Sequence, residues 1–232
     1  MKDKNTGTWR PILLTLAVLA LLIAVCLGLW YWREGSKGPS SSAKPVIYLY
    51  PEEATEASVT LRYMGKLTTT YPLGEREVGG EKGTSSVSWQ VTAQPDGTLT
   101  DADGNTYSYL YWEGETDTQY DLSKGFVVKG EDSADFLREK LSYMGLTPRE
   151  YNEFIVYWLP RLEANAYNLI TFQGEAYTDS ARLAITPEPD CLLRVFMAFR
   201  PLARPIEIPE QELMPFTRTG FTVVEWGGCE LK

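Results

Sequence analysis

A run of 21 residues without a charged side chain begins at Ile12 and ends at Trp32. At the helical rise of about 1.5 Å per residue, the run spans about 31 Å, which is close to the thickness of a bilayer's hydrocarbon core. Trp9 before the run and Tyr31 near its end suit the two membrane interfaces, where aromatic rings settle. The run therefore predicts an uncleaved transmembrane helix over residues 12–32. A cleaved signal peptide is the alternative, although no Ala-x-Ala site follows closely.

This predicted anchor divides the chain into four parts. A short cytoplasmic tail (residues 1–11) precedes the anchor (12–32), a linker rich in Gly, Ser and Pro follows it (33–44), and an exported domain covers the rest (45–232). Basic side chains tie at three on each side of the run, but a short tail before an anchor is the usual layout of a signal-anchor protein, which exports the chain beyond its anchor. We therefore expect a single-pass protein of the cell membrane, with the membrane as its first partner and the C-terminal domain outside the cytoplasm.

The charge balance and the missing histidine exclude several kinds of function. The chain has 22 Lys+Arg against 31 Asp+Glu, a net charge of −9, and no histidine. Nucleic acid is not expected as a partner, because a phosphate backbone needs clustered basic residues. A Ser-His-Asp triad, a Cys-His pair or a His-ligated zinc site cannot be built from this chain alone. No cofactor is predicted.

After Pro45, short alternating or apolar runs separated by turn residues are typical of β-strands. The predicted strands lie at residues 46–50, 58–63, 86–91, 107–112 and 125–128, and then at 167–172, 182–185, 192–199 and 221–226. Between the two groups the apolar period becomes helical, over 132–144 and again after Thr147, where a threonine cap, a proline and Glu150 form a start signal. The predicted fold class is α+β: the transmembrane helix, then one mostly antiparallel, sandwich-like β domain with two helices inserted mid-chain.

Four peptides of the sequence are specific enough to carry a resemblance. They are KPVIYLYP at 44–51, YLYWEG at 109–114, NEFIVYWLP at 152–160 and GFTVVEWGG at 220–228. With these peptides the chain resembles a family of uncharacterised, chiefly bacterial, membrane-anchored proteins. The resemblance implies one co-folded unit over 44–228. It implies no activity, and therefore it carries over no catalytic residues.

Glu225 is the most informative ionisable residue. Alternation along residues 221–226 places Phe221, Val223 and Glu225 on one face of a strand, so a buried face would bury the carboxylate, which then needs a cation or a raised pKa. Arg194 lies similarly on an apolar strand. We expect an internal Arg194–Glu225 ion pair. The alternative is a cleft with an acid/base carboxylate and an anion-binding arginine.

Glu113 follows an aromatic strand and precedes a glycine. Rings beside a carboxylate suit a sugar-binding cleft, in which Tyr111, Trp112 and Trp226 are the candidate binding residues. Two carboxylates at the right separation can hydrolyse a glycosidic bond, so Glu113 and Glu225 form the candidate catalytic pair. The simpler alternative is a solvated glutamate beside packed aromatic side chains.

Asp101, Asp103 and Asn105 have the oxygen spacing of the first half of a calcium loop, but the glutamate that would complete the loop is missing, and a tight hairpin turn is favoured over a metal site. Cys191 and Cys229 each lie at one end of a predicted strand. Antiparallel neighbours would bring them together, and export would permit a disulfide. A disulfide and two unpaired thiols remain open alternatives.

These features leave three functions. The leading hypothesis is a membrane-anchored envelope or surface protein that is not an enzyme and binds a glycan, a peptide or a protein. The first alternative is a carboxylate-dependent envelope glycoside hydrolase acting through Glu113 and Glu225. The second alternative is a subunit of a larger membrane complex.

Overall fold

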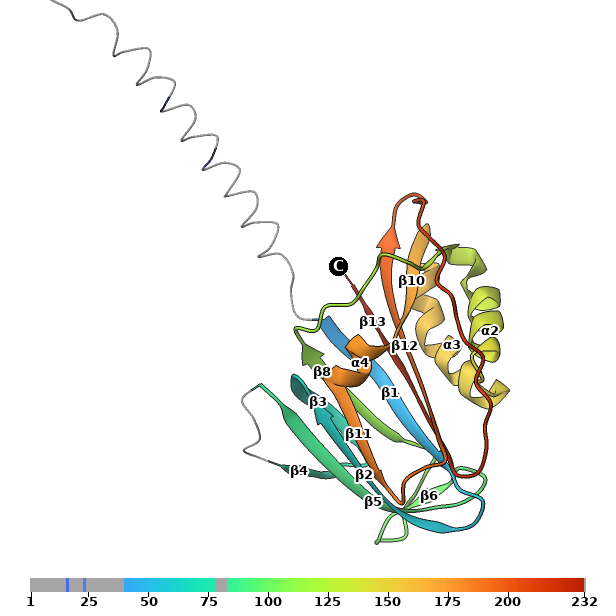
Figure 1. The fold of residues 1–232 in the computed structure, drawn as a ribbon. Helices are drawn as coiled ribbons and strands as arrows, with labels where there is room; N and C mark the ends of the chain where they lie inside the picture. Colours follow the sequence, from blue (N-terminus) through green and yellow to red (C-terminus); the bar gives the residue numbers. More distant parts are fainter. Residues whose placement is uncertain (1–15, 17–22, 24–39, 78–82, 232) are drawn as a thin grey trace, which may run out of the picture. The chain divides into compact units, whose positions relative to one another are not determined.

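The computed structural model describes residues 16, 23, 40–77 and 83–231, and for residues 40 and 41 it describes the backbone only. Contacts divide the chain into two compact units, Met1–Gly38 and Pro39–Lys232. All strands and helices named here belong to the second unit (Figure 1).

A seven-stranded sheet forms the centre of this unit. Its strand order is β3-β8-β1-β13-β12-β10-β9. The strands are β3 (Lys66–Tyr71), β8 (Leu110–Thr116), β1 (Ser40–Tyr50), β13 (Thr222–Glu230), β12 (Cys191–Leu202), β10 (Tyr167–Gln173) and β9 (Phe126–Lys129). Every neighbouring pair is antiparallel except β12 and β13, which run parallel.

A second, six-stranded sheet packs against one face of the first. Its path is β11-β2-β5-β6-β7, and β4 pairs with β5 off this path. The strands are β11 (Ala181–Thr186), β2 (Thr55–Tyr63), β5 (Ser85–Ala93), β6 (Leu99–Thr100), β7 (Thr106–Tyr107) and β4 (Glu75–Glu77). The buried side chains of the two sheets form one apolar cluster between them, as in a sandwich.

The helices contribute to a second apolar cluster on the other face of the seven-stranded sheet. They are α2 (Ser133–Tyr143), which follows the short 3-10 turn η1 (Gly130–Asp132), and α3 (Pro148–Glu163); the short α4 (Glu175–Ser180) follows β10. The predicted start of α3 is confirmed, because Thr147 and Glu150 form a reciprocal capping box with proline at the first turn. Its buried stripe comprises Phe154, Trp158 and Leu162.

Strand β13 supplies side chains to both clusters, as its alternation predicted. Val223 faces the six-stranded sheet, while Val224 and Trp226 face the helices. A strand buried on both faces reads as a nearly continuous apolar run. A buried carboxylate at Glu225 in such a strand must therefore be satisfied by protein groups.

The structure corrects the predicted fold class at its N-terminal element. We expected a transmembrane helix over residues 12–32, but no helix among the described residues is long and apolar enough to cross a membrane. The longest, α3, has 16 residues; it measures about 24 Å, against a hydrocarbon core of about 30 Å. Apart from Leu16 and Ile23, the predicted span lies outside the described residues. The location inferred from that span stays a prediction.

The β-rich part of the prediction agrees better with the structure. Two sheets facing each other across a common core are consistent with a sandwich. The third short helix α4 and the parallel β12–β13 pair were not predicted. A long segment, residues 203–221, has neither helix nor strand and connects these two parallel strands. Parallel neighbours need such a crossover connection, whereas antiparallel neighbours can be joined by a tight turn.

Candidate functional site

The predicted Arg194–Glu225 ion pair is confirmed. The two residues are direct neighbours on β12 and β13, and Nε of Arg194 donates to Oε2 of Glu225 at 2.6 Å. The other carboxylate oxygen accepts from Nε1 of Trp112 at 3.2 Å, and Nη2 of Arg194 donates to the carbonyl of Ala181 at 2.6 Å. The side chain of Glu225 is 0% exposed and that of Arg194 is 9% exposed. Glu225 therefore has protein partners on both oxygens and no access to solvent.

Tyr177 completes the surroundings of this ion pair. Its ring stacks on Phe196 with 4.0 Å between centroids, and the Arg194 guanidinium lies 4.8 Å from the ring centroid. Burial raises the pKa of Tyr177 well above its ordinary value, and the Glu225 carboxylate raises it further. Burial alone would lower the pKa of Arg194, but Glu225 and Tyr177 raise it above its ordinary value. The cluster thus holds a permanent cation between the Glu225 carboxylate and a neutral phenol, so removal of one charged partner would leave the other buried and unpaired.

The structure does not bring Glu113 and Glu225 together as a catalytic pair. On β8, Trp112 is buried with the residues that face the six-stranded sheet, and Glu225 bonds to it on that side. Glu113 is the next residue and so points to the opposite face. Its neighbour in alternation, Tyr111, packs against the helix-side cluster. Two carboxylates on opposite faces of one sheet cannot flank one glycosidic bond.

The three predicted binding aromatics are also separated. Trp112 and Trp226 are both 0% exposed, the first in the core between the sheets and the second in the core under the helices. Only Tyr111 of the three is partly exposed. The sequence could not distinguish a packed tryptophan from a ligand-stacking one, because both occur in the same alternating strands.

On the helix side of the seven-stranded sheet, partly buried tyrosines gather at the margin of the apolar cluster. Tyr109 and Tyr111 on β8 are half-buried, and Tyr71 on β3, directly opposite Tyr111, is 60% exposed. Tyr157 from α3 is half-buried beside them. We call these four residues the tyrosine patch. One ring of the four is exposed and three are partly accessible, so this part of the sheet is a candidate interaction surface.

Lys44 fixes the carboxylate at the centre of this patch. It lies where a bulge interrupts the pairing of β1, between Ala43 and Val46. Its φ is 48°, which makes it the one non-glycine residue with a positive φ in the described part of the chain. Its backbone N–H donates to Oε1 of Glu113 at 3.2 Å. Left-handed backbone costs a non-glycine residue about 1–2 kcal/mol, and such residues occur at turns and bulges as well as at functional sites.

The Lys44 side chain also contacts the patch. Its Nζ lies 5.2 Å from the centroid of the Tyr157 ring and 5.7 Å from that of the Trp226 ring. Arg161 covers the Tyr157 ring as well, at 4.2 Å. Cations over aromatic faces are held there by the ring quadrupole. The backbone and the side chain of Lys44 therefore both position groups of the patch.

The hydroxyls of Tyr109, Tyr111 and Tyr157 stay protonated at neutral pH. Burial and then the Glu113 carboxylate raise the pKa of Tyr111, and burial and then Glu153 raise that of Tyr109. Burial likewise raises the pKa of Tyr157, against a lowering by Arg161. The patch thus combines ring faces, hydroxyl groups that donate and accept, and a half-buried carboxylate.

Sequence analysis did not name six residues of this site as candidates: Lys44, Tyr71, Tyr109, Glu153, Tyr157 and Arg161. Lys44 was placed at the end of a flexible linker, whereas it belongs to β1. Glu153, Tyr157 and Arg161 fall at a spacing of four along α3, so they lie on one helical stripe. That stripe runs beside the buried one and was readable from the sequence. The sequence did not show which strand this stripe packs beside.

The Asp101 motif is a turn rather than a metal site. Oδ1 of Asp101 accepts the backbone N–H groups of Asp103 at 3.0 Å and Asn105 at 2.9 Å, and Oδ2 accepts the Tyr107 hydroxyl at 2.7 Å. These bonds, that of Tyr107 first, lower the pKa of Asp101. They close the β6–β7 hairpin. Across residues 40–77 and 83–231, no group of three or more His, Cys, Asp or Glu side chains is arranged to hold a metal ion.

Of the two alternatives for Cys191 and Cys229, the structure has the free thiols and not the disulfide. Because β12 and β13 run parallel, Cys191 pairs with Thr222 at the start of the ladder and Cys229 pairs with Ala198 near its end. The disulfide assumed antiparallel strands, which would have placed the two strand ends together. Cys229 is buried, and burial raises its pKa. A buried thiol of this kind is unreactive.

Comparison with known proteins gives one partial likeness. Over 73 residues the chain is 48% identical to a Butyrivibrio fibrisolvens protein described as "Uncharacterized protein in bglA 3'region". The matched stretch is 31% of this chain and 66% of that protein, so the chain spans a little less than two thirds of its relative. No family model matches the chain, and no solved structure matches it. That description assigns no activity, so the likeness adds none to this chain.

Proposed function

We propose that this chain is a binding module, not an enzyme, and that it takes a carbohydrate ligand on the tyrosine patch. The observation that supports the proposal is the strained Lys44, which holds Glu113 among half-buried tyrosines. The bulge in β1 favours the left-handed backbone in its own right. The contacts that favour a ligand site are the bond to Glu113 and the ammonium over two rings.

The groups of the patch match the chemistry of a sugar. The apolar C–H face of a pyranose ring packs on an aromatic face. Tyr111 and Tyr71 lie at paired positions of two strands, and the Tyr71 ring also contacts that of Tyr107, with 5.4 Å between centroids. Sugar hydroxyls need partners that both accept and donate. The Glu113 carboxylate accepts one bond from Lys44 and keeps further acceptor capacity, since an ionised carboxylate has about four acceptor sites. The protonated tyrosine hydroxyls supply donors.

Binding without hydrolysis is expected from the same residues. Glycoside hydrolysis needs two carboxyl groups about 5–10 Å apart across the scissile bond. Glu225 is buried in an ion pair on the other face of the sheet. Glu153, the other acid near the patch, accepts a hydrogen bond from the Tyr48 hydroxyl at 3.0 Å. The hydrolase and complex-subunit predictions remain alternatives, and a sedimentation experiment separates them from the proposal.

The test is co-sedimentation of the purified full-length chain with insoluble cellulose, chitin, xylan and peptidoglycan, together with an assay for new reducing ends. The expected result is binding to at least one polymer without release. Tyr111→Ala should weaken that binding about tenfold, which corresponds to about 1.4 kcal/mol. The matched control is Tyr143→Ala, which removes an exposed tyrosine from α2.

Three outcomes would contradict the proposal. Release of reducing ends that depends on Glu113 would indicate a hydrolase. Equal loss of binding in Tyr111→Ala and Tyr143→Ala would place the ligand elsewhere. If the chain binds none of the polymers and a stoichiometric protein partner co-purifies with it, the subunit hypothesis is favoured.

A further inference from the structure

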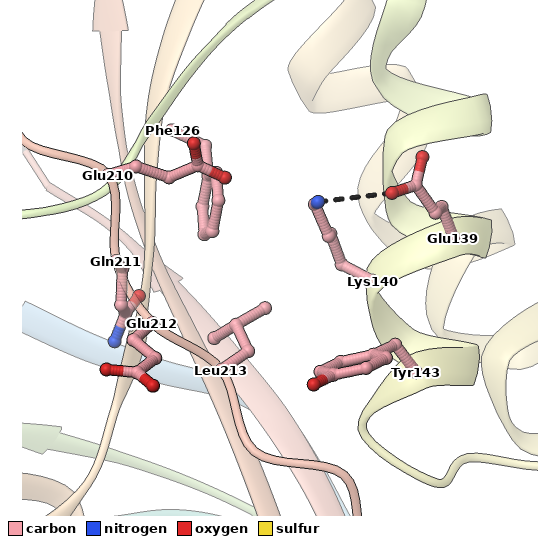
Figure 2. Close-up of a pocket in the computed structure, with 8 residues that line it drawn as sticks. All are labelled: Phe126, Glu139, Lys140, Tyr143, Glu210, Gln211, Glu212 and Leu213. Atoms are coloured by element: carbon pink, nitrogen blue, oxygen red, sulfur yellow. Dashed lines mark hydrogen bonds and ion pairs between the residues drawn. The ribbon is translucent and has the colours of Figure 1, made fainter.

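A furrow runs between α2 and the irregular segment that crosses the edge of the seven-stranded sheet. Two adjoining cavities, of about 500 Å³ and about 510 Å³, share the lining residues Phe126, Glu139, Lys140 and Glu210. Figure 2 shows the first cavity, with Lys140 reaching from α2 toward the segment that carries Glu210 to Leu213. We call the two cavities together the α2 furrow. It is formed by other elements than those of the tyrosine patch.

The furrow is apolar at its base and acidic at its rim. The ring of Phe126 is buried, that of Phe136 is half-buried, and the side chains of Leu213 and Tyr143 extend the apolar surface. Four carboxylates line the two cavities, those of Glu139, Glu207, Glu210 and Glu212.

Lys140 is the one cation among the residues that line the furrow. Its Nζ bonds to Oε1 of Glu139 at 3.1 Å and lies 5.3 Å from the centroid of the Phe126 ring. Three of the four carboxylates thus have no lysine or arginine from the lining to balance them. The charge of the furrow is therefore complementary to a basic ligand.

The free edge of β9 opens into this furrow. Strand β9 ends the sheet and pairs with β10 alone. Just before the first residue of β9, the N–H of Gly125 points away from β10 and donates to the carbonyl of Pro209 at 2.9 Å. Hydrogen-bonding direction alternates along a strand, so the N–H and C=O of Val127 point outward as well. Val127 lines the second cavity.

The backbone of β10 next to this edge supports the outward direction of the Val127 backbone groups. Beyond the first residue of β9, which pairs with Ile170, Phe172 of β10 exposes its backbone groups on the same side. The side-chain amide of Gln211 takes both: its Oε1 accepts from the Phe172 N–H at 2.8 Å, and its Nε2 donates to the Phe172 carbonyl at 2.6 Å. Phe172 and Val127 are thus in the outward sets of their strands. The segment covers the edge at Phe172 and leaves Val127 beside the furrow.

We propose that the α2 furrow is a docking site for an extended polypeptide of a partner protein, with alternating basic and apolar side chains, which adds as a strand to the edge of β9 at Val127. Strand addition gives affinity through main-chain hydrogen bonds and specificity through alternate side chains. In an extended peptide, successive side chains point to opposite faces. Apolar side chains would then enter the base formed by Phe126 and Leu213, while basic ones reach Glu210 and Glu212.

The test uses the full-length chain and a synthetic, end-capped peptide of alternating lysine and valine, with binding measured by calorimetry. Two control peptides share its length: one replaces lysine by glutamate, and one carries N-methyl groups that block main-chain donation. The lysine–valine peptide should bind at least tenfold more tightly than either control. Raising the salt from about 50 to about 500 mM should weaken its binding, because the carboxylates at the rim are exposed.

Variants then locate the peptide. Glu210→Gln with Glu212→Gln should weaken binding several-fold, whereas Glu163→Gln, an exposed glutamate at the end of α3, should leave it unchanged. Tyr111→Ala should not alter peptide binding, so this proposal and the carbohydrate proposal can fail separately. Equal affinity of the N-methylated and unmodified peptides would overturn strand addition. Absence of binding, or binding that ignores both glutamate substitutions, would overturn the site itself.

Discussion

The carboxylates on the two faces of the seven-stranded sheet differ in burial and in hydrogen bonding. On the face toward the six-stranded sheet, Glu225 is fully buried and both its oxygens accept hydrogen bonds from Arg194 and Trp112. On the face toward the helices, Glu113 is half-buried and accepts from the backbone of Lys44 among partly exposed tyrosines. The first carboxylate has both oxygens bonded to the protein and no access to solvent, so it cannot meet a ligand. The second keeps capacity for a ligand.

The two regions also differ in the kind of free-energy cost that they carry. Burying an ion pair is expensive in desolvation, and its removal from one side leaves an uncompensated charge. Holding Lys44 in a left-handed conformation costs less and is local. The desolvation cost of the ion pair arises in the core between the sheets, and the smaller conformational cost of Lys44 arises at the tyrosine patch.

The largest effect is expected when one partner of the buried pair is removed. Arg194→Met should lower the free energy of unfolding by about 3–5 kcal/mol, because it leaves Glu225 buried without its cation. Chemical denaturation measures this. The double variant Arg194→Met with Glu225→Leu should recover most of the loss. A single variant as stable as the original protein would mean that the pair does not constrain the core.

The buried phenol of Tyr177 should make the folding stability of the chain depend on pH in the alkaline range. Its pKa is raised in the folded chain, so above about pH 10 the unfolded chain loses a proton that the folded chain keeps, and stability falls as pH rises. The slope contributed by Tyr177 is about 1.4 kcal/mol per pH unit. Tyr177→Phe should remove this contribution. Identical pH slopes for the two proteins would show that Tyr177 ionises as readily when folded.

The smallest effect concerns Lys44. Both Lys44→Gly and Lys44→Ala lose the ammonium over Tyr157, but only glycine relieves the left-handed backbone. The free energy of unfolding of Lys44→Gly should therefore exceed that of Lys44→Ala by about 1 kcal/mol. Parallel denaturation of the two variants measures the difference. An alanine variant at least as stable as the glycine variant would indicate that the conformation at Lys44 is not strained.

The sequence predicted features that one element carries; of those that depend on two elements it predicted the Arg194–Glu225 pair and missed the others. Alternation over residues 221–226 correctly placed Glu225 with Val223, and the cap at Thr147 correctly began α3, because both signals are local. The direction of β12 relative to β13 is set by the long segment 203–221, and no local pattern reports it, so a Cys191–Cys229 disulfide stayed open until the fold was known. The same limit concealed which face of the sheet Glu113 shares with Tyr157.

The central claim is that Glu225 stabilises the fold and Glu113 serves the ligand. The most direct test measures both properties on Glu225→Gln and Glu113→Gln, side by side, by denaturation and by sedimentation with the polysaccharide that the unmodified chain binds best. We expect Glu225→Gln to lose about 3 kcal/mol or more of stability, and Glu113→Gln to stay within about 1 kcal/mol of the original while binding about tenfold more weakly. A stable Glu225→Gln that no longer binds, or a Glu113→Gln that unfolds instead, would contradict the account.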